Sequence, residues 1–205
     1  MRSKTFFWSI GAWVLVLAIG ASAGAEGGSG QHFRGVINDF TAAHDAKGNP
    51  SGPWELHGVW SLDLSPNGSA ADFSASVNME NSDYWLLINP NPPADPDSPA
   101  TRSPHTHHIK MIDAQVTSDP SSVASGCPTA SYKPPTTTGF MVTGNASITG
   151  NGGYPPFAPQ GQRSPLTVCV TGGNLVRFSN ISLVFGLPAS SHFGTQAING
   201  VVRRK

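Results

Sequence analysis

Residues 54–79 read WELHGVWSLDLSPNGSAADFSASVNM and carry the clearest structural signal in the chain. Apolar residues or glycine occupy every second position from Trp54 to Leu64, and apolar residues do so again from Ala71 to Met79. This is the period of a β-strand with one buried face. Between the two runs, Asn67-Gly68 is typical of a tight hairpin turn. We therefore predict a β-hairpin over residues 54–79.

The composition extends this prediction to the rest of the chain. With 23 Gly, 18 Pro and 12% charged residues, the sequence disfavours long helices. Short apolar runs bounded by turn residues predict further strands at 106–117, 138–149, 165–171, 175–186 and 195–203, with a weaker one over Tyr84–Ile88. The Pro-, Asn- and Gly-rich segments 89–103 and 151–165 are predicted to be long loops, a length typical of lids and other functional loops.

The number and spacing of these strands predict an all-β fold with one disulfide. About eight antiparallel strands form either a single closed β-barrel or a two-sheet β-sandwich. Glycines beside the apolar runs favour the barrel because closure needs bends and bulges, although glycine also suits the corners of a sandwich. We predict the barrel and keep the sandwich as the alternative.

The first 25 residues resemble an export signal. Arg2 and Lys4 precede an apolar run over residues 6–19, and small residues with two A-x-A options follow it. We predict a signal peptide at 1–25, a secreted or periplasmic mature protein, and no membrane span after cleavage. Residues 26–52 are predicted to be a lead-in with a first strand around Phe33–Phe40, and residues 53–205 the barrel domain.

The charge balance argues against a polyanionic partner. The chain has 12 basic and 12 acidic residues, and loss of Arg2 and Lys4 with the signal peptide leaves 10 − 12 = −2. Basic residues run together only at Arg203–Lys205. Nucleic-acid binding needs a basic stripe or patch, so we expect no nucleic-acid partner.

Cys127 and Cys169 are the two cysteines of the chain. An even pair in an exported protein most often forms a disulfide, and the wide spacing does not suit a CxxC or metal-thiolate motif. We therefore predict a Cys127–Cys169 bridge.

Three of the seven histidines lie in the segment PHTHHI, residues 104–109. On a strand, His105 and His107 point to one face and His108 to the other. An H-x-H pair can place two imidazoles on one zinc or copper ion, with a third ligand from elsewhere in the fold. His192, in an apolar turn before the last predicted strand, is our first choice for that ligand.

Other residues offer further roles around such a site. His57 and His44 are the next choices for a third ligand, Glu55 or Asp113 can supply a carboxylate, and His108 or Glu55 can support the ligands from behind. In the alternative interpretation, the histidine cluster binds no ligand and lies on a solvent-exposed strand. Neither the H-E-x-x-H nor the G-x-S-x-G motif is present, so the catalytic residues are unknown.

The sequence is also compatible with a binding site of another kind. Aromatic side chains at the mouth of a barrel can hold a small apolar or carbohydrate-like ligand. Trp54, Trp60 and Phe73 fall on the buried period and are expected to fill the core. Tyr84 and Trp85 lie outside that period, so we assign them to ligand binding together with His57 and Glu55.

Three functions follow. The leading one is a secreted barrel with a small-ligand-binding or structural role. The second is a metal-dependent enzyme that uses His105, His107 and His192. The third is a metal-free barrel isomerase or cyclase with one His or Glu as its acid or base. Convergence of the three imidazoles would favour the second.

Overall fold

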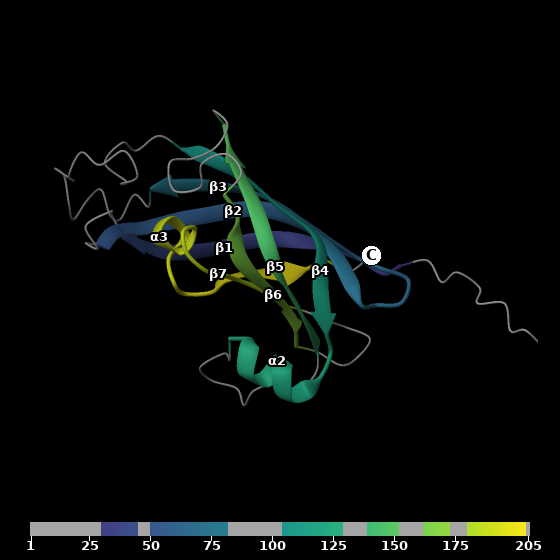
Figure 1. The fold of residues 1–205 in the computed structure, drawn as a ribbon. Helices are drawn as coiled ribbons and strands as arrows, with labels where there is room; N and C mark the ends of the chain where they lie inside the picture. The colour runs from purple at the N-terminus through teal and green to yellow at the C-terminus, as the bar shows by residue number, and fades with distance from the viewer. Residues whose placement is uncertain are drawn as a thin grey trace, which may run out of the picture.

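The computed structural model describes residues 30–44, 50–81, 104–128, 139–151, 162–172 and 180–203. These residues form eight strands: β1 (His32–His44), β2 (Pro50–Leu64), β3 (Ala70–Asn81), β4 (His105–Thr117), β5 (Gly139–Gly150), β6 (Ser164–Thr171), β7 (Asn180–Phe185) and β8 (Ile198–Val202). Each strand pairs antiparallel with the next, and β8 pairs with β1, which closes the barrel (Figure 1). The predicted all-β barrel is confirmed over the sandwich.

The hairpin predicted from residues 54–79 consists of β2 and β3. Trp60 pairs with Ala75 and Leu62 with Phe73, so the two apolar periods face the same side of the sheet. The turn between them passes through Gly68, whose φ of 69° is a conformation that glycine adopts without steric cost. The sequence pattern therefore places this face inside the barrel.

The barrel interior holds one continuous apolar core. Trp54, Leu56, Leu62, Phe73 and Met79 are among its fully buried side chains. The core extends around the barrel through inward residues of β4 to β8 and includes Ala189 and Phe193 near the end of the chain. Trp54, Trp60 and Phe73 are buried, as the period-two pattern predicts.

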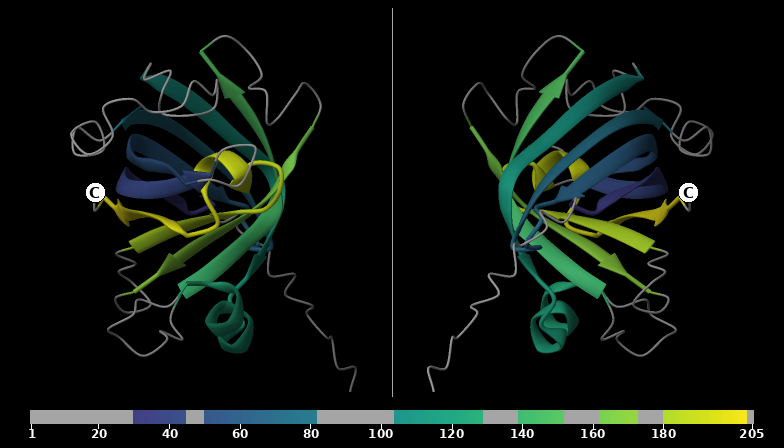
Figure 2. Two further views of the ribbon diagram at one scale, coloured as in Figure 1. Left: turned by 90° about the vertical axis from the view of Figure 1, so that its left-hand side faces the viewer. Right: turned by 90° about the vertical axis from the view of Figure 1, so that its right-hand side faces the viewer.

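Two short helices complete the described structure and were not predicted. The helix α2 (Pro120–Gly126) follows β4, and α3 (Ser190–Phe193) lies between β7 and β8. Figure 2 shows α3 at one end of the barrel, within the ring of strands. Predicted strand Tyr84–Ile88, the predicted loop 89–103 and most of the predicted loop 151–165 lie outside the described residues.

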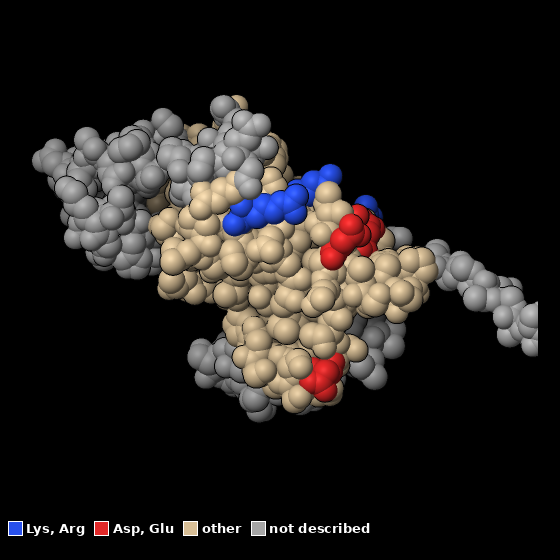
Figure 3. All heavy atoms as spheres, viewed as in Figure 1, with Lys and Arg blue, Asp and Glu red and all other residues tan. Residues whose placement is uncertain are grey.

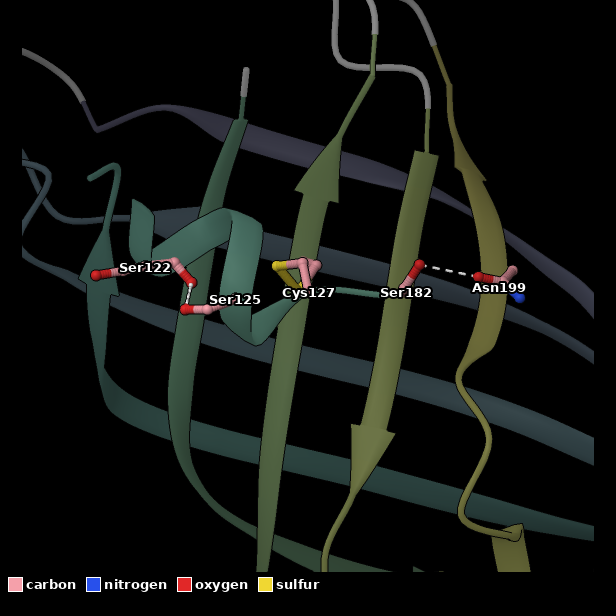
Figure 4. Close-up of a disulfide and its surroundings, with 6 residues drawn as sticks. Ser122, Ser125, Cys127, Ser182 and Asn199 are labelled. Carbon is pink, nitrogen blue, oxygen red and sulfur yellow. Dashed lines mark hydrogen bonds between the residues drawn. A yellow bond between two sulfur atoms is a disulfide. The ribbon is translucent and has the colours of Figure 1, made fainter. Parts of the chain in front are cut away.

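The predicted disulfide joins Cys127 to Cys169. Cys127 follows the last residue of α2, and Cys169 is a fully buried residue of β6 (Figure 4). The bridge therefore fixes α2 against the barrel wall, where Val123 is also buried.

The face in Figure 3 is largely uncharged, in keeping with the low content of charged residues. Among the described residues, no helix combines the length and the apolar character needed to cross a membrane.

Candidate metal centre

The candidate site lies at one end of the barrel. Because neighbouring strands are antiparallel, β4 begins at the same end at which β3 and β7 finish. His105 is the first residue of β4, and α3 follows β7 closely in the chain. The topology thus brings the H-x-H segment and His192 to one place although they are 85 residues or more apart.

The strand β4 directs two imidazoles into the barrel. His105 lies opposite Met79 of β3, and His107 lies opposite Val77. Val77 and Met79 are both buried core residues, so this face of the sheet is the inner one. His107 is only 3% exposed, and His105 is partly exposed at the rim.

The helix α3 supplies the third imidazole. The backbone N–H groups of His192 and Phe193 both donate to the carbonyl of Ala189, at 3.0 and 2.9 Å. Ala189 in turn donates its own N–H to Oγ of Ser164 on β6, at 3.2 Å. The hydroxyl of Thr41 on β1 donates to the carbonyl of Phe193. These bonds hold the helix turn to two barrel strands and leave His192 only 5% exposed.

The three imidazoles converge on one point. Nε2 of His192 lies 3.2 Å from Nε2 of His105 and 3.0 Å from Nε2 of His107. One ring nitrogen from each histidine lies within 4.8 Å of the other two. Nitrogens bound to one tetrahedral zinc ion at 2.0–2.1 Å are about 3.4 Å apart. The two Nε2–Nε2 separations from His192 are close to that value.

Burial keeps two of these histidines neutral. Desolvation, with a smaller contribution from His105, lowers the pKa of His107 to about 3, while hydrogen bonding to the Thr149 backbone acts in the opposite direction. Desolvation and then the neighbouring His107 and His105 lower the pKa of His192 well below its usual value. Neutral imidazoles have the nitrogen lone pair that a metal ion requires.

Apolar and aromatic side chains surround the cluster. The Trp54 ring lies 5.2 Å from the His105 ring, centroid to centroid, in an edge-to-face arrangement, and 6.3 Å from the His192 ring. Phe193 contacts the His107 ring at 5.0 Å and stacks on Phe185 at 4.6 Å. Such walls limit access of water and strengthen electrostatic interactions at the site.

Several other predicted site residues lie elsewhere. Glu55 and His57 are on the outer face of β2, where their side chains approach to 3.3 Å. His108 is exposed on the outer face of β4. Asp113 is an exposed residue in the irregular region of the same strand, and its backbone N–H donates to Asp72. None of these four belongs to the converging group of histidines.

Tyr84, Trp85 and the side chain of His44 lie outside the described part of the structure. Two residues at the site were not predicted to have a role there: Thr41, which anchors α3, and Trp54, which was expected only to fill the core. The sequence does place Phe193 next to His192, and this adjacency is a signal for its role as a wall of the site.

Comparisons of the chain with protein-family models, curated proteins and solved structures found no match.

Proposed function

We propose that the protein is a metal-dependent enzyme, which binds one zinc or copper ion through His105, His107 and His192. The observation that carries this proposal is the approach of Nε2 of His192 to Nε2 of both other histidines, at 3.2 and 3.0 Å. Imidazole nitrogen suits both metals. Chance placement of three histidines on a barrel would not be expected to bring their rings together on its inner side.

The donor set supports a catalytic site rather than a structural one. Structural zinc sites are closed by four protein ligands, whereas catalytic sites have three and leave a position for water or substrate. In the described part of the chain, the converging group has three members. A metal ion with an open position polarises a bound oxygen and lowers the pKa of bound water, which is the chemistry of hydrolysis.

This geometry leads us to favour the metal centre over the small-ligand-binding or structural role that comes first from sequence alone. A metal-free isomerase or cyclase remains the reading to adopt if the protein takes up no metal. We further propose that the protein is secreted or periplasmic. The Cys127–Cys169 disulfide supports this location because such bonds persist in oxidising compartments.

The test is the metal content of untagged protein purified without chelator, followed by titration of the metal-free protein with Zn²⁺ and with Cu²⁺. We expect about one ion per chain for at least one metal. The His105→Ala/His107→Ala double variant and His192→Ala should both lose it.

The chain offers a matched control. His108 is adjacent to His107 but lies on the outer face of β4, so His108→Ala should retain the metal. Uptake of neither metal by the unmodified protein would refute the proposal. Equal uptake by His192→Ala would show that the ion lies elsewhere.

A further inference from the structure

Trp54 has a buried polar group with no hydrogen-bond partner among the described residues. Its side chain is 1% exposed. In the described structure, its indole Nε1 is inaccessible to solvent and has no hydrogen-bond partner. Buried tryptophan N–H groups usually find an acceptor, and a buried donor without one is costly to retain. An unsatisfied group of this kind calls for a specific explanation.

The position of Trp54 suggests an explanation for its unpaired indole N–H. Its ring contacts His105 edge to face at a centroid distance of 5.2 Å and lies 6.3 Å from His192. It therefore forms a wall of the site at which the three ring nitrogens converge. An acceptor bound at that site would lie within the apolar surroundings of the indole, where a hydrogen bond is stronger than in water.

We infer that the indole N–H of Trp54 donates a hydrogen bond to the ligand in the open position of the proposed metal centre. This inference rests on the proposed function and specifies its ligand class. A ligand that binds the metal and accepts from Trp54 needs lone pairs for both, as a small carboxylate does. The geometry thus points to an oxygen ligand, and we propose a substrate or product with a carboxylate or similar oxyanion; a hydrocarbon, which has no lone pairs, is excluded.

A second tryptophan provides a matched control. Trp60 is on the same inner face of β2, is 3% exposed, and also has a buried Nε1 with no partner among the described residues. Trp60 lies six residues farther along β2 than Trp54, which corresponds to about 20 Å between the two tryptophans. Its Nε1 faces Gly35, where an added Cβ would come within 2.7 Å of it.

The experiment uses Co²⁺-loaded protein, whose visible spectrum reports on the ligands of the ion, and acetate as the probe. Trp54→Phe removes the N–H and keeps an aromatic ring. Loss of a hydrogen bond to a charged acceptor should weaken acetate binding about tenfold to hundredfold. Trp54→Phe should still bind Co²⁺, and Trp60→Phe should bind acetate like the unmodified protein. Equal acetate affinity in Trp54→Phe and Trp60→Phe would overturn the inference.

A second measurement follows acetate binding in the unmodified protein. In Zn²⁺-loaded protein labelled with ¹⁵N, the indole N–H resonance of Trp54 should shift on addition of acetate, while that of Trp60 stays in place. Resonances are assigned from single Trp→Phe substitutions. A Trp54 resonance that does not move at saturating acetate would also overturn the inference. If the protein binds neither Zn²⁺ nor Cu²⁺, the proposed function fails and this inference fails with it. If the protein binds metal and Trp54 does not affect acetate, the inference alone fails.

Discussion

The hydroxyl of Thr41, near the end of β1, donates a hydrogen bond to the backbone carbonyl of Phe193, the residue after His192. Thr41 is fully buried, and the two residues are 152 positions apart. This bond ties the short helix that carries the third histidine to the barrel wall. A four-residue helix has little stability of its own. The bond from Thr41 therefore helps to hold His192 in position beside the other two histidines.

Thr41→Val should therefore weaken both the fold and the proposed metal site. Valine keeps the shape and removes the donor, so the free energy of unfolding should fall by about 1 kcal/mol. Zn²⁺ affinity should fall as well, although all three ligands remain. Urea denaturation and a Zn²⁺ competition titration measure the two effects. Thr106→Val is the control, because Thr106 donates to Asn78 on the outer face, and it should leave Zn²⁺ affinity unchanged. An identical Zn²⁺ affinity in Thr41→Val would contradict this role.

The metal-free protein should lose stability in mild acid. The pKa of His107 falls to about 3 in the folded protein, and that of His192 is also lowered, whereas both are near 6.5 in the unfolded chain. The unfolded chain therefore takes up protons first. The stabilisation is complete above about pH 6.5 and is lost as the pH falls toward the folded values, by up to about 1.4 kcal/mol per pH unit for one histidine.

Urea midpoints between pH 7.5 and 5 in the presence of a chelator test this dependence. His107→Leu should flatten the profile because one of the titrating groups is gone. His108→Leu, an outer-face change on the same strand, should keep the original slope. A metal-free protein with the same midpoint throughout this range would rule out the burial of neutral histidines as an important contribution.

Much of the barrel could be predicted because its strands have one buried face. The alternation from Trp54 to Met79 specifies which residues point inward, and the described hairpin follows it. The same alternation places Glu55 and His57 in the opposite phase from Trp54. The sequence pattern therefore already places these two side chains on the outer face.

The candidate site was predicted in part. The spacing of His105 and His107 places them on one face of a strand, and the apolar surroundings of His192 favour it as the third ligand. Their convergence depends on β7 and β4 reaching the same barrel end, which is a property of topology and not of local pattern. Local sequence patterns do not predict two long-range features of the site, the contact of Trp54 with His105 and the hydrogen bond that anchors α3 to Thr41.

The helix α2 was missed for a different reason. Its sequence, PSSVASG, is rich in serine and has one buried apolar residue, Val123, so it lacks the period of an amphipathic helix. The signals at its start were nevertheless available. Asp119 accepts a hydrogen bond from the Ser122 backbone as the N-cap, and Pro120 opens the helix, both common at these positions.

Loss of the disulfide should destabilise the protein without disturbing the histidines. The Cys127–Cys169 bridge closes a loop with a sequence separation of 42 residues, which corresponds to about 3–4 kcal/mol in the loop-entropy model. Cys127→Ala/Cys169→Ala and the reduced unmodified protein should show similar losses in guanidinium denaturation. Both should bind Zn²⁺ with unchanged affinity under native conditions, because the bridge secures α2 and not α3. A parallel loss of Zn²⁺ binding would show that the two regions are coupled.

Closure of the barrel between β1 and β8 should depend on Gly35. This residue pairs with Trp60 on one side and Val202 on the other. A Cβ at position 35 would lie 1.8 Å from the carbonyl oxygen of Val201 and 2.7 Å from Nε1 of Trp60. Because the first of these atoms belongs to the backbone, Gly35→Ala should cost about 1–3 kcal/mol or prevent closure. Gly144→Ala is the comparison, since its nearest contact is the flexible end of Met111 at 2.8 Å, and it should cost less in the same urea series. A Gly35→Ala protein as stable as Gly144→Ala would mean that the β1–β8 seam accommodates a side chain at this position.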